Sequence, residues 1–439
     1  MTPTEAMISK RAQPARYRLA GGKALQGSVV VQGAKNAALP MIAASLLPKS
    51  GQTILRNVPP LNDVYIQLAL MAALGARVLY DAGERVLVVD PSTVSSHVLD
   101  PELTTRSRAS ILLLPSILHK LGRVVFQGVG GCALGVRRLD FHHNGFKRLG
   151  ATVEGHHDHL VIEASELRGS LTYLDMPSQT STENLMMAGC FAKGVTTIEN
   201  AACEPEVVDF GNFLRKMGAK LHGLGTSTVT IEGVTELQAI EYTVMADRLD
   251  AGAFMMAAAI TKGEVELIGA HLDQMRILVA KLQQMGTSIV SEGPLVRVRG
   301  PDRLRPVNVI SWPYPGFSTD FLPGIMALTS VADGTSPLRE SVFEDRFTQV
   351  EGLNSLGARI IRKERNLAQV EGVPRLKGAR VTAPDLRAGM AFVLAGLSAE
   401  GETIVGNAYQ IERGHADIEG RLRRLGATIT REEVVDEPK

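Results

Sequence analysis

A triplet made of an apolar residue, glycine and a small residue recurs six times along the 439-residue chain, and this repeat limits the possible folds more than any other feature. The copies are Leu74-Gly75-Ala76, Leu149-Gly150-Ala151, Met217-Gly218-Ala219, Met285-Gly286-Thr287, Leu356-Gly357-Ala358 and Leu425-Gly426-Ala427. Each copy ends an amphipathic stretch and precedes a strand-like run. We therefore predict that each glycine caps the C-terminus of a helix, where it adopts the left-handed conformation without a Cβ clash.

A second shared element lies upstream of each triplet and consists of a glycine, a short β-rich run and a loop, as in GQTILRNVPP and GEVELIGAHL. The triplet glycines stand 68 to 75 residues apart, which is too far for a thin solenoid of short repeats. Grouping three units per domain predicts an α/β protein with two similar domains, residues 36–245 and residues 1–35 plus 246–439. The N-terminal segment would then complete the second domain, with Lys35-Asn36 as a hinge.

Charge, hydropathy and cysteine usage exclude several classes of protein. Lys and Arg number 47 against 46 acidic residues, so no basic field is present to hold a nucleic acid. No apolar stretch approaches the roughly 18 residues that span a membrane, and the N-terminus lacks the apolar core of a secretory signal. The cysteines Cys132, Cys190 and Cys203 are odd in number and far apart, unlike a disulfide framework or a CxxC site. We expect a cytoplasmic protein without nucleic-acid or membrane partners.

A glycine-rich loop carries Cys132. Residues 128–133 superficially fit the dinucleotide fingerprint, but their strand occupies the same place in the repeat as five strands that lack glycine clusters. Arg137 and Arg138 follow closely and would favour the thiolate. The alternative is a small buried hydrophobic residue, the commoner fate of a free cysteine. The surrounding glycines favour a functional role for Cys132, whereas Cys190 and Cys203 read as structural or incidental.

The histidine-rich run at residues 155–159 invites a metal-site interpretation. It separates two β-like runs, ATVEG and LVIEA, where a polar hairpin turn is expected, and its spacing suits no helical pair of ligands. We favour the solvated turn.

The Pro-rich stretch 312–320 reads as a loop that presents Asp320. A carboxylate at the end of such a loop suits a general base, while the alternative is an N-cap for the apolar helix that begins near Phe321. Both interpretations remain open from sequence. Several basic residues close to loop-to-helix junctions could together clamp a small polyanion, since guanidinium groups pair bidentately with carboxylate and phosphate. They are Lys35, Arg108, Arg137, Arg346, Arg387 and Arg413.

Nine motifs occur in collinear order over essentially the whole chain. They are GAKNAALP (33–40), RAS (108–110), GGCALGVRRLD (130–140), TEN (182–184), ENAACEPEVVD (199–209), FSTD (317–320), EDRF (344–347), APDLRA (383–388) and ERG (412–414). In this combination the chain resembles the UDP-N-acetylglucosamine 1-carboxyvinyltransferase family. The resemblance implies two inverse α/β barrel-like domains, each of three βαβαββ units. The cysteine of the GGC loop sets this family apart from the related shikimate-phosphate enolpyruvyl transferases.

The resemblance also implies roles for individual residues. Lys35 would meet phosphoenolpyruvate, Asn36 the sugar, and Asp320 the reacting sugar hydroxyl. Cys132 would take part in protonating the enolpyruvyl methylene and would be the target of fosfomycin. Arg108, Arg137, Arg387 and Arg413 would surround phosphoenolpyruvate, with Lys35, Cys132, Asp320 and Arg413 as the catalytic set. Further substrate-binding positions implied by the resemblance are Arg138, Asp140, Ser178, Val342, Arg346 and Asp385.

The implied reaction moves the enolpyruvyl group of phosphoenolpyruvate to the 3-hydroxyl of UDP-N-acetylglucosamine and releases phosphate, a step toward peptidoglycan. No metal or organic cofactor is implied, because the arginine set supplies the positive charge. An alternative is the same transfer to another nucleotide or nucleotide sugar, since the chain departs from the family at Arg138, Gln179, Thr180 and residues 321–324. A silent binding protein of the same fold is a third alternative, disfavoured by retention of the catalytic set.

Overall fold

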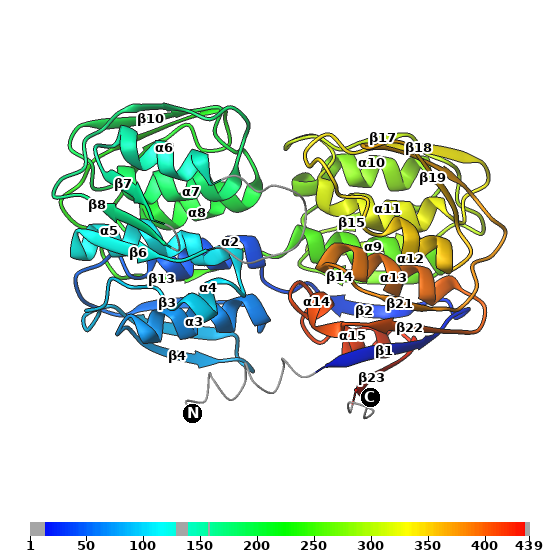
Figure 1. Cartoon of the computed structure of the whole chain (residues 1–439). Coiled ribbons are helices and arrows are strands. Elements are labelled where there is room, and N and C mark those ends of the chain that lie inside the picture. The colour runs from blue at the N-terminus through cyan, green and yellow to red at the C-terminus, as the bar shows by residue number, and fades with distance from the viewer. Residues whose placement is uncertain (1–13, 129–138, 157–158, 435–439) are drawn as a thin grey trace. The chain divides into compact units, whose positions relative to one another are not determined.

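The chain passes twice between two compact units (Figure 1). The computed structural model describes residues 14–128, 139–156 and 159–434. Of these, the residues from 33 to 245 form the first unit, and those before 33 and after 245 form the second. The predicted hinge residues Lys35 and Asn36 begin helix α2 (Lys35–Ala44) of the first unit.

Each unit is built from three small sheets that share one strand order. An edge strand pairs in parallel with its neighbour, and the next two strands continue antiparallel. In the first unit the sheets are β13-β3-β5-β4 (Glu241–Thr243, Thr53–Arg56, Val86–Asp90, Arg77–Asp81), β6-β8-β7 (Arg123–Phe126, Leu160–Glu163, Thr152–Gly155) and β9-β10-β12-β11 (Leu171–Tyr173, Val195–Glu199, Thr228–Glu232, Lys220–His222). In the sheet β6-β8-β7 the parallel edge partner is reduced to a single bridge between Val98 and Val125.

The sheets of the second unit repeat this order. They are β2-β14-β16-β15 (Gln26–Val30, Glu264–Ile268, Leu295–Arg299, Ser288–Glu292), β17-β18-β20-β19 (Val309–Ile310, Thr335–Arg339, Leu367–Glu371, Arg359–Glu364) and β21-β22-β1-β23 (Arg380–Thr382, Glu402–Gly406, Ala15–Ala20, Thr428–Glu433). The six sheets therefore correspond to the six repeats of the sequence.

Strands from distant parts of the sequence complete the sheets of each unit. In the first unit β13 pairs with β3, so that Glu241 lies opposite Ile54. In the second unit β1 lies between β22 and β23, and Arg18 is opposite both Ile404 and Thr430. Each unit therefore contains a sheet whose strands come from chain segments that lie far apart in sequence.

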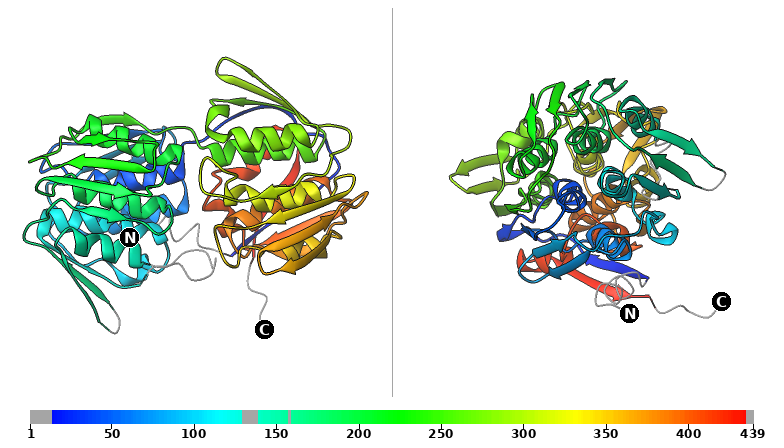
Figure 2. Two further views of the ribbon diagram at one scale, coloured as in Figure 1. Left: turned by 90° about the horizontal axis from the view of Figure 1, so that it is seen from above. Right: turned by 90° about the vertical axis from the view of Figure 1, so that its left-hand side faces the viewer.

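Helices fill the interior of each unit, and the right-hand view of Figure 2 looks along several of them with strands around. Each repeat contributes one central helix. The central helices are α2, η1 (Arg108–Leu113) with α5 (Leu114–Leu121), α7 (Gln179–Gly189), α9 (Arg248–Ile260), η3 (Thr319–Phe321) with α11 (Leu322–Thr329), and α13 (Leu386–Ser398). Every residue of α9 is buried, and beyond its first turn the helix is apolar on all sides.

A second helix in each repeat leads into the antiparallel strands. These helices are α3 (Asn62–Ala73), α6 (Asp140–Arg148), α8 (Pro205–Lys216), α10 (Arg276–Gln284), α12 (Val350–Ser355) and α15 (Ile418–Arg424). Shorter elements are α4 (Pro101–Thr104), η2 (Leu272–Met275) and α14 (Ala408–Glu412). Within the described ranges, none of the helices combines the length and apolar character needed to span a membrane.

The triplet glycines end the second helix of each repeat, as predicted. All six have φ between 86° and 110°, in the left-handed region. In each case the next residue donates a backbone hydrogen bond five residues back, for example from Ala76 to Met71 and from Ala427 to Leu422, both at 3.0 Å. This is the Schellman motif, which satisfies carbonyl groups that the helix end would otherwise leave free. The two units are therefore similar α/β barrel-like domains of three repeats each.

Candidate active site

Most of the predicted site residues that the structure describes lie at the beginnings of helices. In the first unit Lys35 is the first residue of α2, Arg108 is the first residue of η1, and Ser178 immediately precedes α7. In the second unit Asp320 lies in η3 and Asp385 immediately precedes α13. The first N–H groups of a helix carry partial positive charge and have no partner within the helix. These positions are therefore suited to anionic ligands.

Lys35 is held by a buried ion pair. Its Nζ atom lies 3.1 Å from Oδ2 of Asp63, near the start of α3, and both side chains are almost fully buried. An ammonium group removed from water needs such a partner. Asp63 therefore fixes the position of Lys35, and the sequence analysis did not identify this partner. The adjacent residue, Asn36, is half-buried.

A buried histidine connects α6, which begins with Asp140, to α7, which follows Ser178. Asp140 begins α6, and His142 in the same helix has Nε2 3.2 Å from Oγ of Ser181 and Nδ1 3.0 Å from Nδ2 of Asn184, both in α7. Ser178 donates a 2.9 Å hydrogen bond to Ser181. Burial lowers the pKa of His142 to about 3, so its ring is neutral near pH 7. His142 thus joins the beginnings of α6 and α7 through uncharged hydrogen bonds.

In the second unit Asp320 is paired with two arginines from separate segments. Nη2 of Arg346 donates to Oδ1 of Asp320 at 2.6 Å, and Nη2 of Arg387 donates to Oδ2 at 2.9 Å. The arginine side chains are only 4% and 9% exposed, whereas Asp320 is 22% exposed. The carboxylate is therefore partly open to solvent while the two cations behind it are enclosed. Arg346 also lies over the ring of Phe343, with 5.2 Å to the centroid.

Asp320 does not cap a helix. The cap of η3 is Ser318, whose Oγ accepts from the Asp320 backbone N–H at 3.3 Å, and α11 has no side-chain cap. The N-cap interpretation of Asp320 is therefore wrong, because Ser318 already takes that role two residues earlier. The Asp320 carboxylate is left to interact with the arginines.

The loop before Asp320 borders an open space within the second unit. Tyr314, Gly316 and Ser318 line a cavity of about 320 Å³ together with residues of α9, η2 and α10. The guanidinium group of Arg248, the first residue of α9, lies 5.5 Å from the centroid of the Tyr314 ring. A ligand thus has room beside the loop that carries Asp320.

Asp385 caps helix α13 and so orients Arg387. Its Oδ1 accepts from the backbone N–H groups of Arg387 and Ala388 at 2.8 and 3.0 Å, and Oδ2 accepts from Oγ1 of Thr348 at 2.7 Å. Such a cap stabilises a helix by about 1 kcal/mol and fixes its first turn. The carboxylate thereby holds the beginning of α13, the turn that carries Arg387.

Val342 lies in a turn that is organised by Glu340. This glutamate is buried and its Oε1 accepts from the backbone N–H groups of Val342 and Phe343 at 2.7 and 3.1 Å. Its Oε2 accepts from Oγ1 of Thr319 at 2.6 Å. Glu340 therefore ties the Val342 turn to η3, the helix of Asp320. The sequence analysis did not identify Glu340, because a glutamate beside a strand carries no distinctive pattern.

Arg413 follows α14 and is 5% exposed. Its Nη1 donates to Oε1 of Gln410 at 3.1 Å. The next residue, Gly414, lies close to α13: a Cβ atom there would be 2.8 Å from Cδ1 of Leu386 and 3.7 Å from Nη1 of Arg387. Glycine therefore allows the Arg413 turn to approach the helix that carries Arg387.

Three predicted residues, Cys132, Arg137 and Arg138, lie outside the described residues, so their roles stay predictions. The other two cysteines are free thiols. Cys190 is buried, and burial raises its pKa to about 12; burial, and to a lesser degree Glu204, raises the pKa of Cys203 as well. The raised pKa values disfavour the thiolate at both positions, which were predicted to be structural or incidental.

The described residues on either side of the histidine-rich run pair as expected for a hairpin. β7 and β8 pair antiparallel up to Gly155 and Leu160, and the backbone N–H of His156 donates to the carbonyl of His159 at 2.8 Å. Within the described residues, no three His, Cys, Asp or Glu side chains are grouped so that they could hold a metal ion.

The comparisons with known proteins cover nearly the whole chain. The family model of EPSP synthase (3-phosphoshikimate 1-carboxyvinyltransferase) matches residues 19–422. The UDP-N-acetylglucosamine 1-carboxyvinyltransferase of Thermobifida fusca is 48% identical over 96% of this chain and 99% of its own length. The UDP-N-acetylglucosamine 1-carboxyvinyltransferase 1 of Symbiobacterium thermophilum is 46% identical over 95% of either chain.

Solved structures share the fold at lower identity. The enolpyruvyl transferase NikO of Streptomyces tendae superposes with a TM-score of 0.86 at 23% identity, covering 96% of this chain and 100% of that one. EPSP synthase of Acinetobacter baumannii gives a TM-score of 0.75 at 18% identity, covering 95% and 100%. These likenesses show that the chain shares the fold of the enolpyruvyl transferases.

Proposed function

Because this chain belongs to the UDP-N-acetylglucosamine 1-carboxyvinyltransferase family, we propose that it transfers the enolpyruvyl group of phosphoenolpyruvate to the 3-hydroxyl of UDP-N-acetylglucosamine and releases phosphate. The pairing of a partly exposed carboxylate, Asp320, with two enclosed arginines is the observation that best supports this chemistry. It combines a proton acceptor with cations that suit a substrate bearing both phosphate and carboxylate.

The proposed reaction is an addition followed by an elimination. The sugar hydroxyl oxygen bonds to C2 of phosphoenolpyruvate while its proton passes to Asp320 and a proton is added to C3. The resulting tetrahedral intermediate then loses a proton from C3, and the bond between C2 and the phosphate oxygen breaks. Proton gain and loss at C3 cancel, and the hydroxyl proton passes from Asp320 to the departing phosphate or to solvent, so the products are the enolpyruvyl ether and phosphate.

The basic residues would hold the negative charge through both steps. Lys35 and Arg108 of the first unit and Arg387 and Arg413 of the second are the described candidates, and each lies at a helix end or in an adjoining turn. Fixed guanidinium and ammonium groups stabilise such an intermediate more than water does, since they need no reorganisation. When the acceptor binds, its hydroxyl would replace one arginine contact at Asp320 and leave the carboxylate available as the base.

The resemblance to this family also supports roles for further residues. Cys132 is proposed to take part in proton transfer at C3, with Arg137 beside phosphoenolpyruvate and Arg138 near the acceptor. Asn36, Asp140, Ser178 and Val342 are proposed to contact the acceptor, and Arg346 and Asp385 to complete the site. The free thiols Cys190 and Cys203 suit a reducing cytoplasm, which we keep as the proposed location.

The test is phosphate release from phosphoenolpyruvate with UDP-N-acetylglucosamine as acceptor. Asp320→Asn should lower kcat by roughly 10²- to 10⁴-fold, because it removes the base. Asp345→Asn is the matched control: Asp345 also pairs with an arginine, Arg362 at 3.2 Å, but the pair is exposed. Equal activity of the two variants would contradict the role of Asp320.

The acceptor and the cysteine can be separated in the same assay. Turnover with another nucleotide sugar but not with UDP-N-acetylglucosamine would move the proposal to the alternative acceptor, as the departures at Gln179 and Thr180 allow. Fosfomycin pretreatment should abolish turnover of the unmodified chain and spare that of Cys132→Asp. Persistent inactivation of this variant would show that the drug acts elsewhere.

A further inference from the structure

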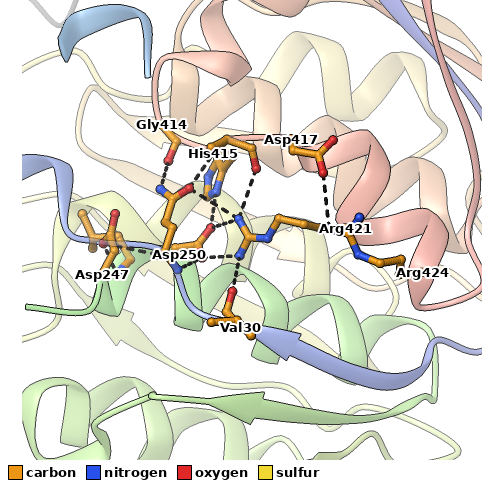
Figure 3. A network of polar contacts seen from close by, with 11 residues as sticks. Val30, Asp247, Asp250, Gly414, His415, Asp417, Arg421 and Arg424 are labelled. Atoms are coloured by element: carbon orange, nitrogen blue, oxygen red, sulfur yellow. Dashed lines mark hydrogen bonds and ion pairs between the residues drawn. The ribbon is translucent and has the colours of Figure 1, made fainter. Parts of the chain in front are cut away.

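A buried polar network surrounds the turn that follows Arg413 (Figure 3). Nδ1 of His415 lies 3.0 Å from Oδ1 of Asp250 in α9, and the same carboxylate makes two contacts with the guanidinium group of Arg421 in α15, one through Nη1 at 3.0 Å and one through Nη2. His415 and Asp250 are at most 1% exposed, and the Arg421 side chain is 6% exposed. The network thus joins α9 to the segment of residues 415–421, which lies far from α9 in sequence.

The side chain of Gln32 holds the backbone on both sides of His415. Its Nε2 donates to the carbonyl of Gly414 at 2.8 Å, and its Oε1 accepts from the backbone N–H of Ala416 at 2.9 Å. The backbone N–H of Gln32 in turn donates to Oδ2 of Asp250 at 3.3 Å. The amide side chain of Gln32 therefore hydrogen-bonds to the backbone groups of the turn, as a neighbouring strand would.

The protonation states fit this arrangement. Burial lowers the pKa of His415 despite the nearby carboxylate, so the ring is neutral near pH 7 and donates from Nδ1. Burial alone would raise the pKa of Asp250, but Arg421 and the hydrogen bond from His415 hold it well below its usual range. Asp250 is thus an ionised acceptor that receives hydrogen bonds from several sides.

A buried ion pair is not explained by stability alone, since apolar residues of similar volume often stabilise a core equally well. What the network does here is restrict a turn. Gly414 and His415 directly follow Arg413, and the close approach of Gly414 to Leu386 and Arg387 makes the position of this turn depend on α13 as well. Any shift of the turn would move Arg413 relative to Arg387.

We propose that His415 is a positioning residue, which together with Gln32 and the Asp250–Arg421 pair fixes the turn that presents Arg413 beside the start of α13. This inference rests on the proposed function, because Arg413 matters only as a ligand of the phosphoenolpyruvate anion. His415 itself touches no reacting atom. Its effect on the reaction passes through the place that it gives to Arg413.

The test compares His415→Leu with His415→Asn. Leucine removes the hydrogen bond to Asp250, whereas the Nδ2 of asparagine can take the place of the imidazole Nδ1. His415→Leu should raise the KM for phosphoenolpyruvate about tenfold or more and leave the KM for the acceptor nearly unchanged, because misplacing one anion ligand weakens one substrate. His415→Asn should recover most of this loss.

A control separates positioning from general destabilisation. Asn354→Ala removes two side-chain hydrogen bonds to Ile360 elsewhere in the second unit, far in sequence from the network. It should lower the melting temperature without changing the KM for phosphoenolpyruvate. The inference is overturned if His415→Leu changes both KM values alike, if it behaves like Asn354→Ala, or if His415→Asn is as impaired as His415→Leu.

Amide hydrogen exchange of the peptide covering residues 411–417 gives a second measurement that needs no turnover. His415→Leu should increase exchange there, and His415→Asn should restore protection. If the unmodified chain shows no phosphate release, the proposed function fails, and unchanged exchange in folded His415→Leu would overturn the positioning role separately.

Discussion

The two units solve the same structural problem with different chemistry. Each has a buried histidine near the start of a second helix of a repeat, where it reaches a central helix. In the first unit His142 bonds to the neutral side chains of Ser181 and Asn184. In the second unit His415 bonds to Asp250, which is paired with Arg421. One architecture thus accepts an uncharged or an ionic junction at similar places.

The two junctions should differ in how much stability is lost when one member is removed. Removing one member of a neutral set leaves a single hydrogen-bonding group unsatisfied, which costs about 1–3 kcal/mol. Removing one member of a buried ion pair leaves an uncompensated charge, which costs about 3–5 kcal/mol. The second unit should therefore respond to substitution more sharply, and the first more gradually.

The largest predicted effect is that of Asp250→Asn. It keeps the shape of the side chain but leaves Arg421 as a buried charge without its counter-ion, so the free energy of unfolding of the second unit should fall by about 3–5 kcal/mol. Urea denaturation followed by hydrogen exchange of peptides from each unit would measure it. Asn184→Ala in the first unit is the comparison and should cost about 1–3 kcal/mol. Equal losses would remove the distinction between the two junctions.

The next effect is the acid response of the first unit. The pKa of His142 is about 3 in the folded chain and about 6.5 when unfolded, so the unfolded state binds a proton first as pH falls through this window. Stability should therefore decline on acidification by up to about 1.4 kcal/mol per pH unit between pH 6 and 4. The measurement is urea denaturation at several pH values for the unmodified chain and for His142→Gln.

Comparison with His142→Gln is needed because another buried group has the opposite sign. Burial, with Glu204 and despite a hydrogen bond from Gln179, raises the pKa of Glu183 well above its usual value. The folded state then retains a proton that the unfolded state loses, so this group favours the folded state at low pH. The difference between the two chains isolates the histidine. A difference that does not vary with pH would show that His142 is not buried as a neutral ring.

A smaller effect, equal in both units, is expected at the repeat glycines. Gly218 and Gly426 have φ values of 110° and 93°, and an added Cβ would meet no atom within 4 Å at either position. Substitution by alanine therefore tests backbone conformation alone and should cost about 1–2 kcal/mol in each unit. Thermal denaturation of the two variants is the measurement. Unequal losses of stability would mean that one of the two glycines stabilises its unit by more than the left-handed helix cap.

The smallest effect should come from exposed ion pairs. Arg56 with Glu241 in the first unit and Arg359 with Glu371 in the second have side chains that are at least half exposed. Charge-neutralising substitution of either pair should change stability by less than about 1 kcal/mol, because water and salt screen the attraction. Denaturation in low and high salt would check this. A loss of stability comparable to that of Asp250→Asn would show that solvent exposure does not determine how much an ion pair contributes to stability.

The repeat allowed much of the fold to be predicted from sequence. Gly75 and its five counterparts end helices because left-handed φ values are a local property that glycine reports directly. The pairing of β1 with β22 and β23 is not local. The alternation of apolar and polar residues along β1 is compatible with several partner strands. Only the grouping of three repeats per domain pointed toward it.

The candidate site was predicted less completely, for a physical reason. Asp320, Arg346 and Arg387 were each selected, but their contact depends on pairings across 26 and 67 residues, which composition and spacing do not encode. The N-cap alternative for Asp320 failed because α11 has no side-chain cap and the side chain that caps η3 is Ser318. Gln32 and His415 were missed entirely, since one amide and one imidazole form no motif and meet only after the second unit has folded.

The position of β1 between β22 and β23 limits the order in which the chain can fold while it is being synthesised. Strand Ala15–Ala20 emerges from the ribosome long before its partners, Glu402–Gly406 and Thr428–Glu433. Between them the whole first unit is produced as an insert whose ends meet, since the Ala34 N–H donates to the Met245 carbonyl at 2.8 Å. The insert can therefore fold while the nascent β1 strand still waits with both edges unpaired. A newly made chain is therefore exposed to mispairing of β1 with a wrong neighbour until β22 and β23 have been synthesised.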